Sequence, residues 1–426
     1  MNLTNKQNLA YDKMINGFNV FLTGPGGTGK SYLLKHFINY KKNTLKKNDK
    51  YSLVVTSTTG LSSSLINGVT LHSWAGIGTG EELIDVYYDK IKNNSLKLNN
   101  WLYAKILIID EISMLNPELF QRLDLLGRKL RKNDKPFGGI QIILSGDFCQ
   151  LPTVNSHYFC FEALNWNSVI DYTFYLNENL RLNNNENIFQ NSLNEIRLGI
   201  VSEETKNLLK SRIKSRENIF GIIPTTLYPI KKKVKEYNEK KLKELLDKNI
   251  DYVEYNAEYK YSKTISNDQK IFLKDCIDKN KTIDNYIKLC IGAQVIVNVS
   301  IPAQNLFNGS RGIIIGFDKN LPIVKFLDGK EKTIELYKWE LDNGIIISKI
   351  QIPLILGWAM TIHKSQGMTL DYVYTDIGDS IFEYGQTYVV LSRVKSLESL
   401  FLKNIDFSKI FANPKVIDYY NSINND

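Results

Sequence analysis

The chain contains few cysteines and no long apolar run, and each shortage excludes a class of protein. Four cysteines among 426 residues form neither a C-x-x-C pair nor a disulfide-scaffold density: Cys149, Cys160, Cys276 and Cys290. No apolar run reaches the roughly 18 to 20 residues that a membrane-spanning helix needs. The first residues contain no apolar signal region and no arginine-rich transit pattern. We therefore expect a soluble intracellular protein, in the cytoplasm or the nucleus depending on the host.

The composition is that of a globular protein with more than one domain. Hydrophobic residues make up 43% of the chain and charged residues 23%. A single core stops growing near about 250 to 300 residues, so 426 residues are expected to form at least two domains. Lys and Arg number 54 against 45 Asp and Glu. The formal net charge of +9 favours a polyanionic partner such as nucleic acid, although this excess alone is weak evidence.

The first half of the chain alternates short apolar runs with helix-like stretches. The runs at 20–22, 53–55, 107–109 and 140–144 each end in Gly, Ser, Thr or Asp. This alternation predicts a parallel sheet covered by helices, with ligands at the carboxyl ends of the strands. We expect a first α/β domain of this kind over residues 1–176.

A second α/β region follows and is interrupted. Between residues 288 and 350 the pattern changes to short strands broken by Gly and Asn, and α/β character resumes at Ala359. We therefore expect a second domain made of two segments, with an inserted helical and β-barrel-like part between them. The expected limits are 177–230 and 350–426 for the second domain and 231–349 for the insertion.

The strongest single signal is the glycine-rich segment GPGGTGKS. It fits the pattern G-x-x-x-x-G-K-[ST] directly after the apolar run 20–22 and before a helical pattern. Its backbone N–H groups would converge on phosphate oxygens at a helix N-terminus, with a lysine charge on the β and γ phosphates and a hydroxyl on Mg²⁺. The alternative, a flexible glycine-rich turn, is disfavoured by this placement. The predicted nucleotide-binding residues are Gly24, Pro25, Gly26, Gly27, Thr28, Gly29, Lys30 and Ser31.

A phosphate-binding loop of this type needs an acidic residue at the end of another strand to hold the metal. Residues 106–111, ILIIDE, supply one. Asp110 is expected to hold Mg²⁺ together with Ser31, and Glu111 to orient or deprotonate the attacking water. An acidic turn after a buried strand is the alternative, and the phosphate-loop pattern makes it less favoured. The sequence thus predicts ATP and Mg²⁺ as cofactors.

Three further polar residues are candidates for contact with the γ-phosphate. Gln150 follows the apolar run 140–144, where its amide would sense that phosphate. Arg181 and Arg393 lie in the second region, so each is a candidate for a charge delivered across a domain cleft. We expect Arg393 at the tip of an element, because it follows the apolar run 388–390. Without such context a single arginine is more often part of a surface ion pair.

These motifs, in this order, resemble superfamily-one helicases of the Pif-type (petite integration frequency) family. The resemblance depends most on residues 110–141, which contain DEISML, LGRKLRK and PFGGIQ. Two residues depart from the family pattern: Trp74 stands where Phe is usual, and Leu182 where Gln usually follows Arg181. Other matching segments extend over nearly the whole chain, namely TTG at 58–60, LHSWAG at 71–76, PTTLYP at 224–229, IHKSQGMTL at 362–370 and YVVLSR at 388–393.

The resemblance implies a fold and an activity. It implies two RecA-like motor domains with parallel sheets, ATP between them, and a glutamine, Gln7, that reads adenine. It also implies translocation 5′ to 3′ on single-stranded DNA, with unwinding of duplexes and often of G-quadruplexes, in replication, repair or telomere and genome maintenance. We expect a monomeric motor that acts at single-strand/duplex junctions, with a small wedge near residues 72–82 of the first domain.

DNA contacts are expected from segments that resemble the DNA-facing loops of the family. Basic and hydroxyl groups bind phosphates, and aromatic rings stack on bases at about 1 to 3 kcal/mol per base. For Trp74 we favour stacking on DNA over packing in the core. The lysine-rich stretch 231–243 is interpreted as a solvated helix face in preference to a DNA track. The predicted DNA-binding residues are Thr58, Thr59, His72, Trp74, His363, Lys364 and Ser365.

Two other functions stay open. A RecD-type recombination helicase would keep most of the motor motifs, but the segment 111–141 and the absence of a nuclease or relaxase extension disfavour it. A non-translocating ATPase switch would keep the phosphate loop and bind nucleic acid or a protein without unwinding. Measurements of DNA-stimulated ATP hydrolysis, followed by strand displacement, separate these alternatives.

Overall fold

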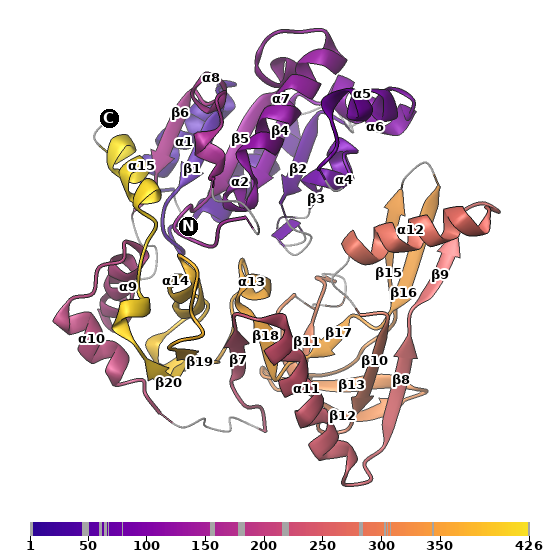
Figure 1. The fold of residues 1–426 in the computed structure, drawn as a ribbon, viewed down its shortest axis with the longest axis vertical. Coiled ribbons are helices and arrows are strands. Elements are labelled where there is room, and N and C mark those ends of the chain that lie inside the picture. Colours follow the sequence, from indigo (N-terminus) through magenta and orange to yellow (C-terminus); the bar gives the residue numbers. More distant parts are fainter. Residues whose placement is uncertain are drawn as a thin grey trace. The chain divides into compact units, whose positions relative to one another are not determined.

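The computed structural model divides the chain into two compact units, shown in Figure 1. Unit 1 is formed by residues 1–198 and 412–426, and unit 2 by residues 199–411. The residues that the structure describes are 3–44, 51–58, 62–63, 66, 68–78, 80–153, 158–177, 184–214, 221–280, 284–301, 304, 306, 308–342 and 345–424.

The two units divide the chain at places other than those expected from the sequence. Helix α9 (Asn184–Arg197) belongs to unit 1, although the expected first domain ended at residue 176. Helix α15 (Pro414–Asn424) packs on the sheet of unit 1, although its residues were expected in the second domain. The units describe packing and do not test independent folding, so the sequence-based domain limits stay predictions.

A six-stranded parallel sheet lies at the centre of unit 1, in the order β3-β2-β4-β5-β1-β6. Every residue of β1 and β4 is buried, as near-continuous apolar runs predict for parallel strands covered on both faces. The predicted α/β sheet is therefore confirmed. The strands are β1 (Val20–Thr23), β2 (Leu53–Ser57), β3 (Val69–Thr70), β4 (Ile106–Asp110), β5 (Gln141–Gly146) and β6 (Tyr172–Tyr175).

Helices α1 and α2 share a core with this sheet. Met14 and Phe37 are fully buried and pack with residues of β1, β4 and β5. Helix α1 begins with a capping box, in which Thr4 and Gln7 each accept a hydrogen bond from the backbone N–H of the other. The helices of unit 1 before α9 are α1 (Asn5–Ile15), α2 (Lys30–Thr44), α4 (Leu71–Ala75), α5 (Ile84–Lys92), α6 (Ser95–Tyr103), α7 (Pro117–Arg131) and α8 (Trp166–Val169), with 3-10 turns η1 (Ile112–Met114), η2 (Pro136–Gly139) and η3 (Cys160–Glu162).

One buried carboxylate organises the segment that carries the family resemblance. Asp124 on α7 accepts hydrogen bonds from the Arg128 guanidinium at 3.0 Å and from the Asn165 amide at 3.0 Å. It also accepts one from the backbone N–H of Phe137, on η2, at 2.6 Å. At Gly127 a Cβ would lie 2.9 Å from the Phe137 carbonyl oxygen, so helix and turn approach closely only because this residue is glycine.

Unit 2 contains a second parallel sheet, of four strands in the order β18-β7-β19-β20. The strands are β7 (Thr225–Tyr228), β18 (Ala359–Thr361), β19 (Val373–Ile377) and β20 (Leu400–Ile405). The helical elements of unit 2 outside the antiparallel part are α10 (Glu203–Lys210), α11 (Lys231–Leu246), α13 (Ile362–Ser365) and α14 (Gln386–Leu391), with 3-10 turns η5 (Leu397–Ser399) and η6 (Phe407–Lys409). Helix α11 packs against β7 and β18, although its residues were expected in the insertion.

Antiparallel strands form the inserted part of unit 2, as expected from the sequence. Five of them pair in the order β14-β13-β12-β11-β17, three in the order β15-β16-β9, and β10 pairs with β8. Fully buried Lys349 donates to Asp278 at 2.9 Å and so attaches α12 to β16. The elements are β8 (Tyr252–Asn256), β9 (Glu258–Tyr261), α12 (Asn267–Asn280), β10 (Tyr286–Cys290), β11 (Gln294–Val297), β12 (Arg311–Asp318), β13 (Leu321–Phe326), β14 (Glu331–Thr333), β15 (Tyr337–Asp342), β16 (Ile346–Gln351) and β17 (Leu354–Leu356).

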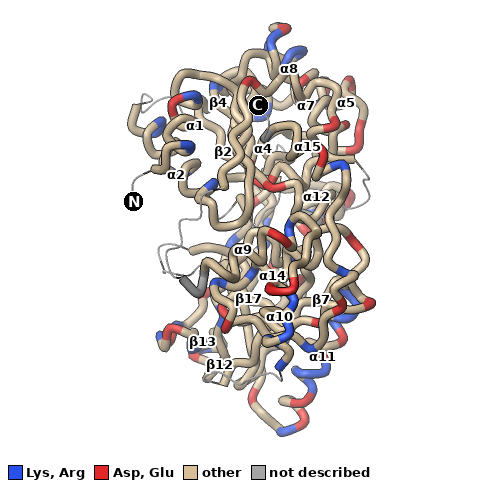
Figure 2. The backbone as a smooth tube through the Cα atoms, turned by 90° about the vertical axis from the view of Figure 1, so that its left-hand side faces the viewer, with Lys and Arg blue, Asp and Glu red and all other residues tan. Residues whose placement is uncertain are grey.

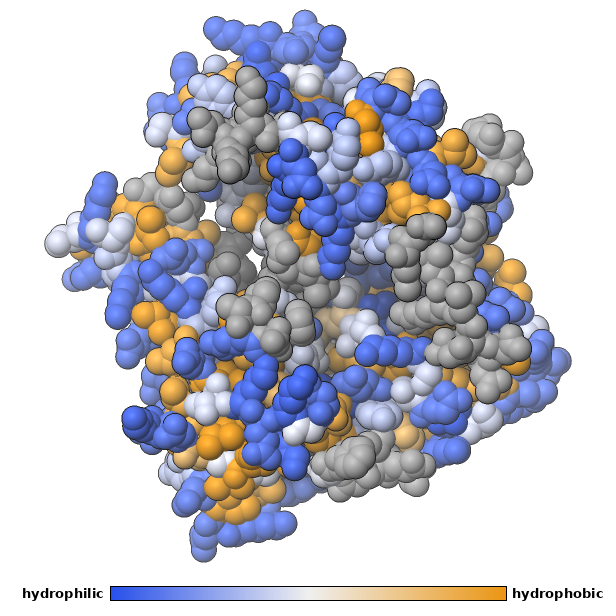
Figure 3. Space-filling view, turned by 180° about the vertical axis from the view of Figure 1, so that it is seen from behind, coloured by the Kyte–Doolittle hydropathy of each residue, from blue (hydrophilic) through white to orange (hydrophobic). Residues whose placement is uncertain are grey.

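One face of the molecule is mainly polar. On the face shown in Figure 3, hydrophilic side chains predominate and apolar side chains lie in small groups among them. Within the described ranges, no helix has both the length and the apolar character that a membrane span requires.

Replacement of Asp124 by alanine is expected to destabilise unit 1. The change leaves the buried N–H of Phe137 without its acceptor and removes the partner of Arg128. A buried donor left unsatisfied costs about 1 to 3 kcal/mol, and a domain of about 150 to 250 residues loses about 2 to 4 °C per kcal/mol. We expect the thermal midpoint to fall by several degrees. Asp89→Ala, at an exposed position on α5, is the control and should leave the midpoint almost unchanged. An equal midpoint for the two variants would contradict the role of Asp124.

Candidate functional site

Residues 24–31 connect β1 to α2 at the carboxyl edge of the sheet in unit 1. Gly24, Gly27 and Gly29 have φ angles of +134°, +87° and +81°, in the region that favours glycine. A side chain at Gly24 would collide with the carbonyl oxygen of Leu176. The glycines therefore allow a path of the loop that other residues would strain.

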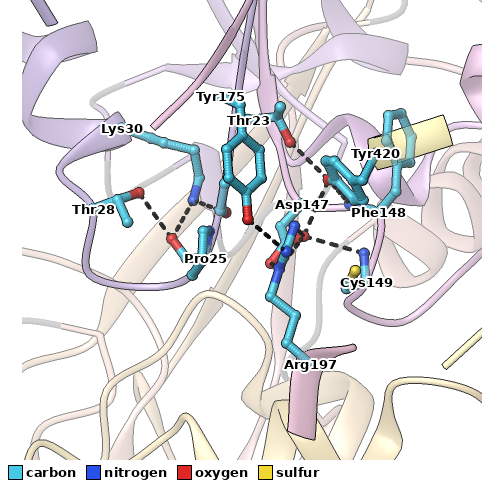
Figure 4. Close-up of polar contacts among 11 residues, drawn as sticks. Thr23, Pro25, Thr28, Lys30, Asp147, Phe148, Cys149, Tyr175, Arg197 and Tyr420 are labelled. Carbon is cyan, nitrogen blue, oxygen red and sulfur yellow. Dashed lines mark hydrogen bonds and ion pairs between the residues drawn. The ribbon is translucent and has the colours of Figure 1, made fainter. Parts of the chain in front are cut away.

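The side chain of Lys30, the first residue of α2, points back into this loop (Figure 4). Its Nζ donates to the carbonyl oxygens of Gly24 at 2.6 Å and Pro25 at 2.8 Å. Burial lowers the pKa of Lys30, and the nearby carboxylates of Asp147 and Glu111 oppose that shift. An ammonium group in such a place, with carbonyl oxygens as partners, is suited to exchange them for phosphate oxygens.

Gln7 contacts the same loop from α1. Its side chain is almost fully buried, and Nε2 donates to the carbonyl oxygen of Thr28 at 3.1 Å. The Thr28 hydroxyl donates to the carbonyl oxygen of Pro25 at 2.9 Å. The structure thus brings Gln7 to the phosphate-loop segment, 21 residues further along the chain. Its reading of adenine stays a prediction.

Asp110 is the last residue of β4, near the centre of the same sheet, and Glu111 follows it. Burial raises the pKa of Asp110, while nearby Lys30 acts in the opposite direction. Glu111 has φ +55°, a left-handed conformation that is costly for a residue with a side chain and is often found at functional sites. Thr58, at the end of β2, donates its hydroxyl to the Glu111 carbonyl oxygen at 2.8 Å. The predicted DNA-facing threonine therefore lies directly beside the predicted catalytic acid.

The oxygen atoms of Ser31 and Asp110 fit a hard cation such as Mg²⁺. Among the described residues, no group of three or more His, Cys, Asp and Glu side chains is placed to hold a metal. Mg²⁺ is usually held by one or two protein oxygens together with substrate phosphates, which agrees with this small donor set. A bound cation would also relieve the cost of burying the Asp110 carboxylate.

Gln150 lies in the loop after β5, which ends at the same edge of the sheet as β4. Its backbone N–H donates to the carbonyl oxygen of Asp147 at 3.0 Å. The side chain is 7% exposed, and its Oε1 has no hydrogen-bond partner among the described residues. A buried amide oxygen with acceptor capacity left over is suited to orient a water molecule or a protonated phosphate oxygen.

Two residues that were not predicted from the sequence contact a carboxylate in the loop after β5. Arg197 forms a buried ion pair with Asp147, with Nη2 at 2.8 Å from Oδ1, and Tyr420 bonds to the same carboxylate at 3.2 Å (Figure 4). Because they lie 50 and 273 residues from Asp147, no spacing pattern could have found them.

The DNA-binding prediction for residues 363–365 needs one correction. His363 and Lys364 on α13 are half-buried, and this burial lowers the pKa of both side chains. Ser365 is fully buried, and its hydroxyl donates to the carbonyl oxygen of Ile362 at 2.7 Å. A hydroxyl that is committed to the backbone of its own helix is not presented to DNA.

Arg393 lies at the end of α14, as expected, but its side chain is buried. The residue is 6% exposed, just after α14. Its guanidinium donates to the carbonyl oxygens of Val389 at 2.8 Å, Met368 at 3.1 Å and Ser365 at 3.3 Å. These bonds connect α14 to α13 and the turn that follows it, because a buried guanidinium needs acceptors on several sides.

For Trp74 the structure favours packing in the core over stacking on DNA. The residue is 5% exposed, and its ring centroid lies 4.7 Å from that of fully buried Trp101. Asn100 donates to its carbonyl oxygen at 2.9 Å, which attaches α4 to α6. Burial also lowers the pKa of the neighbouring His72. Two other predicted residues, Thr59 and Arg181, lie outside the described residues.

The structure supports the interpretation of the lysine-rich helix α11 as a solvated face. Figure 2 shows Lys and Glu side by side along it. Lys232, Lys235 and Lys241 pair with glutamates three or four residues further along the helix, and none of the α11 residues is buried.

Comparisons with known proteins give one consistent result. The family model described as PIF1-like helicase matches residues 2–207. The ATP-dependent DNA helicase PIF1 of Xenopus laevis is 36% identical over 431 residues, which cover 99% of this chain and 64% of the frog protein. The chain therefore spans less than two thirds of the length of this relative.

Two solved structures are similar over their whole length. A crystal structure of the Pif1 helicase from Candida albicans is 33% identical, with a TM-score of 0.84 over 99% of this chain and 100% of that chain. A crystal structure of the Bacteroides Pif1 helicase with ADP-AlF3 and single-stranded DNA is 28% identical, with a TM-score of 0.73 over 100% of this chain and 98% of that chain.

Replacement of Trp74 by alanine is expected to destabilise unit 1 by about 3 to 5 kcal/mol, as for other buried aromatic residues. The thermal midpoint should fall, while the folded protein keeps its affinity for a fluorescent single-stranded oligonucleotide. Tyr103→Ala, an aromatic residue that is 56% exposed on α6, is the control and should melt almost normally. A normal midpoint together with weakened DNA binding would instead favour the stacking interpretation.

Proposed function

The chain belongs to the PIF1-like helicase family, and from that premise we propose that it is an ATP-dependent DNA helicase that moves 5′ to 3′ along single-stranded DNA. The observation that carries the proposal is the convergence of Lys30, Asp110 and Gln150 at one edge of the sheet in unit 1. We also propose that it unwinds duplex and G-quadruplex DNA and acts in replication, repair, recombination or telomere maintenance. We propose further that it works as a monomer and binds single-strand/duplex junctions.

The proposed chemistry is hydrolysis of the terminal phosphoanhydride. Lys30 would stabilise charge on the β and γ phosphates, and Gln150 would orient the attacking water. That water forms a bond to the γ phosphorus while the bond to the β–γ bridging oxygen breaks, and its proton passes toward Glu111. Ser31 and Asp110 are the residues proposed to hold Mg²⁺, which neutralises developing charge on the phosphates when bound.

Arg181 and Arg393 are the proposed cations that contact the γ-phosphate during turnover. For Arg393 this requires that its guanidinium give up bonds to Val389, Ser365 and Met368. Such an exchange is costly unless the phosphate replaces these acceptors, since a buried charge needs partners. The contact would therefore form together with a rearrangement around α13.

Support for a DNA partner comes from the charge of the chain and from its relatives. The formal net charge is +9, and the similar Bacteroides protein was crystallised with single-stranded DNA. Affinity for single-stranded DNA should then weaken with added salt, by a slope of about 0.7 per neutralised phosphate. The switch alternative would bind DNA and hydrolyse ATP without separating strands.

Replacement of Lys30 by alanine is expected to abolish DNA-stimulated ATP hydrolysis and strand displacement, because the phosphate-facing charge is lost while the loop backbone remains. Lys42→Ala, at an exposed position in the last turn of α2, is the matched control. Duplexes with a 5′ tail or a 3′ tail test the polarity in the same series. Hydrolysis by Lys30→Ala at the parent rate would remove the phosphate-loop assignment. Stimulated hydrolysis by the parent chain without displacement of any tailed duplex would support the switch.

Replacement of Glu111 by glutamine is expected to leave nucleotide affinity almost unchanged and to slow turnover by about 10²- to 10⁴-fold, the usual contribution of a general base. The metal-binding carboxylate of Asp110 is untouched by this change. Titration with a fluorescent, non-hydrolysable ATP analogue gives the affinity, and steady-state phosphate release gives the rate. Loss of affinity in proportion to the rate would show that Glu111 is structural.

A further inference from the structure

Tyr420, on helix α15, holds three parts of unit 1 together through one hydroxyl (Figure 4). The hydroxyl lies 2.7 Å from Thr23 Oγ1 at the end of β1, directly before the phosphate loop. It accepts from the backbone N–H of Phe148 at 3.0 Å and donates to Asp147 Oδ1 at 3.2 Å. Since a phenol has one proton, Thr23 is the donor in the first of these bonds. The bonding capacity of the hydroxyl is thus filled by β1 and by the loop after β5.

The Asp147 carboxylate is the common acceptor of this cluster. Its side chain is fully buried and receives Arg197 through Nε and Nη2, at 2.8 to 3.1 Å, and the backbone N–H of Cys149 at 3.1 Å. Burial would raise the pKa of Asp147, but the charge and hydrogen bonds of Arg197 outweigh burial and the pKa is lowered. Burial raises the pKa of Tyr420 well above its usual value, so its hydroxyl keeps its proton. The Asp147 carboxylate is therefore ionised, and the Tyr420 hydroxyl keeps the proton that it donates to it.

The cluster is adjacent to the residues proposed to turn over ATP. The loop that Asp147 organises carries Gln150, whose N–H donates to the Asp147 carbonyl oxygen. The Asp147 charge also acts on the Lys30 ammonium and opposes the effect of burial on its pKa. Through Thr23 and Asp147, Tyr420 contacts the segments that precede and face the phosphate loop.

Two residues that contact this carboxylate lie close, along the chain, to the two points where the chain passes from one unit to the other. The first point is at residues 198–199, immediately after Arg197, and the second at 411–412, shortly before Tyr420. Arg197 and Tyr420, which donate to the Asp147 side chain from outside its own loop, therefore flank the part of the chain that forms unit 2.

We propose that Tyr420 and Arg197 are positioning residues for ATP turnover, which tie both connections between the units to the Asp147 loop and hold Gln150 against the phosphate loop. This inference depends on the proposed function, because it concerns the same nucleotide site. The competing explanation is that Tyr420 only packs α15 onto unit 1, as its ring contacts with Tyr175 and Arg197 would do without the hydroxyl.

Replacement of Tyr420 by phenylalanine separates these explanations, because it keeps the ring contacts and removes only the hydroxyl. We expect the affinity for a fluorescent, non-hydrolysable ATP analogue to stay within about twofold and kcat to fall on the order of tenfold or more, since misplaced catalytic groups lose rate. Rates are measured on the full chain with saturating single-stranded DNA, well below the melting temperature, and are normalised to the nucleotide-binding fraction.

Tyr419→Phe is the matched control. It removes a hydroxyl from the neighbouring residue of α15, whose ring stacks on Phe161 with centroids 4.1 Å apart, and the bonds to Thr23, Phe148 and Asp147 all come from Tyr420. The control should keep kcat within about twofold. A kcat of Tyr420→Phe equal to that of the control, or a loss explained entirely by weaker nucleotide binding, overturns the positioning role.

The parent chain and Lys30→Ala distinguish failure of this inference from failure of the proposed function. If the parent hydrolyses ATP with DNA and Lys30→Ala does not, the nucleotide site is established whatever Tyr420→Phe does. A parent chain without DNA-stimulated hydrolysis would overturn the proposed function, and with it the inference that depends on it.

Discussion

Parallel pairing of β1, β4 and β5 is the constraint on which the rest of unit 1 depends. Parallel strands end at the same edge of a sheet, so Thr23, Asp110 and Gly146 lie there together although they are far apart in the chain. The lysine, the acidic pair and the glutamine of the candidate site lie at the ends of these strands or in the segments that follow them. Helices on the sheet exclude water from its strands, which explains why Lys30 and Asp110 have pKa values shifted by burial.

The parts of the fold and site that could be predicted are those in which a local pattern determines the path of the backbone. Glycines with positive φ mark the phosphate loop, and an apolar run that ends in Asp110 marks a buried strand leading to an exposed edge. The alternation of runs and helices predicted the sheet of unit 1, and a change to short strands broken by Gly and Asn predicted the antiparallel insertion of unit 2. Each signal lies within a few residues, so it can be read without knowledge of tertiary contacts.

Burial between distant elements could not be predicted in this way. An aromatic residue among small neighbours suits either a loop or a core, and the partner that decides the matter for Trp74, Trp101, lies on another helix. Three of the acceptors of Arg393 are backbone carbonyls, which every residue has and no sequence pattern marks. Arg197 and Tyr420, which contact Asp147, lie 50 and 273 residues away from it in the sequence. A single buried ion pair between distant residues gives no repeating pattern in the sequence from which it could be predicted.

Unit 1 consists of two stretches of chain separated by the whole of unit 2. A ribosome adds roughly 5 to 20 residues per second, so the 273 residues between Asp147 and Tyr420 take about 14 to 55 seconds to make. During that time a nascent unit 1 has Asp147 and Thr23 without the hydroxyl that joins them in the finished protein. The direction of synthesis therefore places the completion of the nucleotide-binding unit after that of the unit inserted into it.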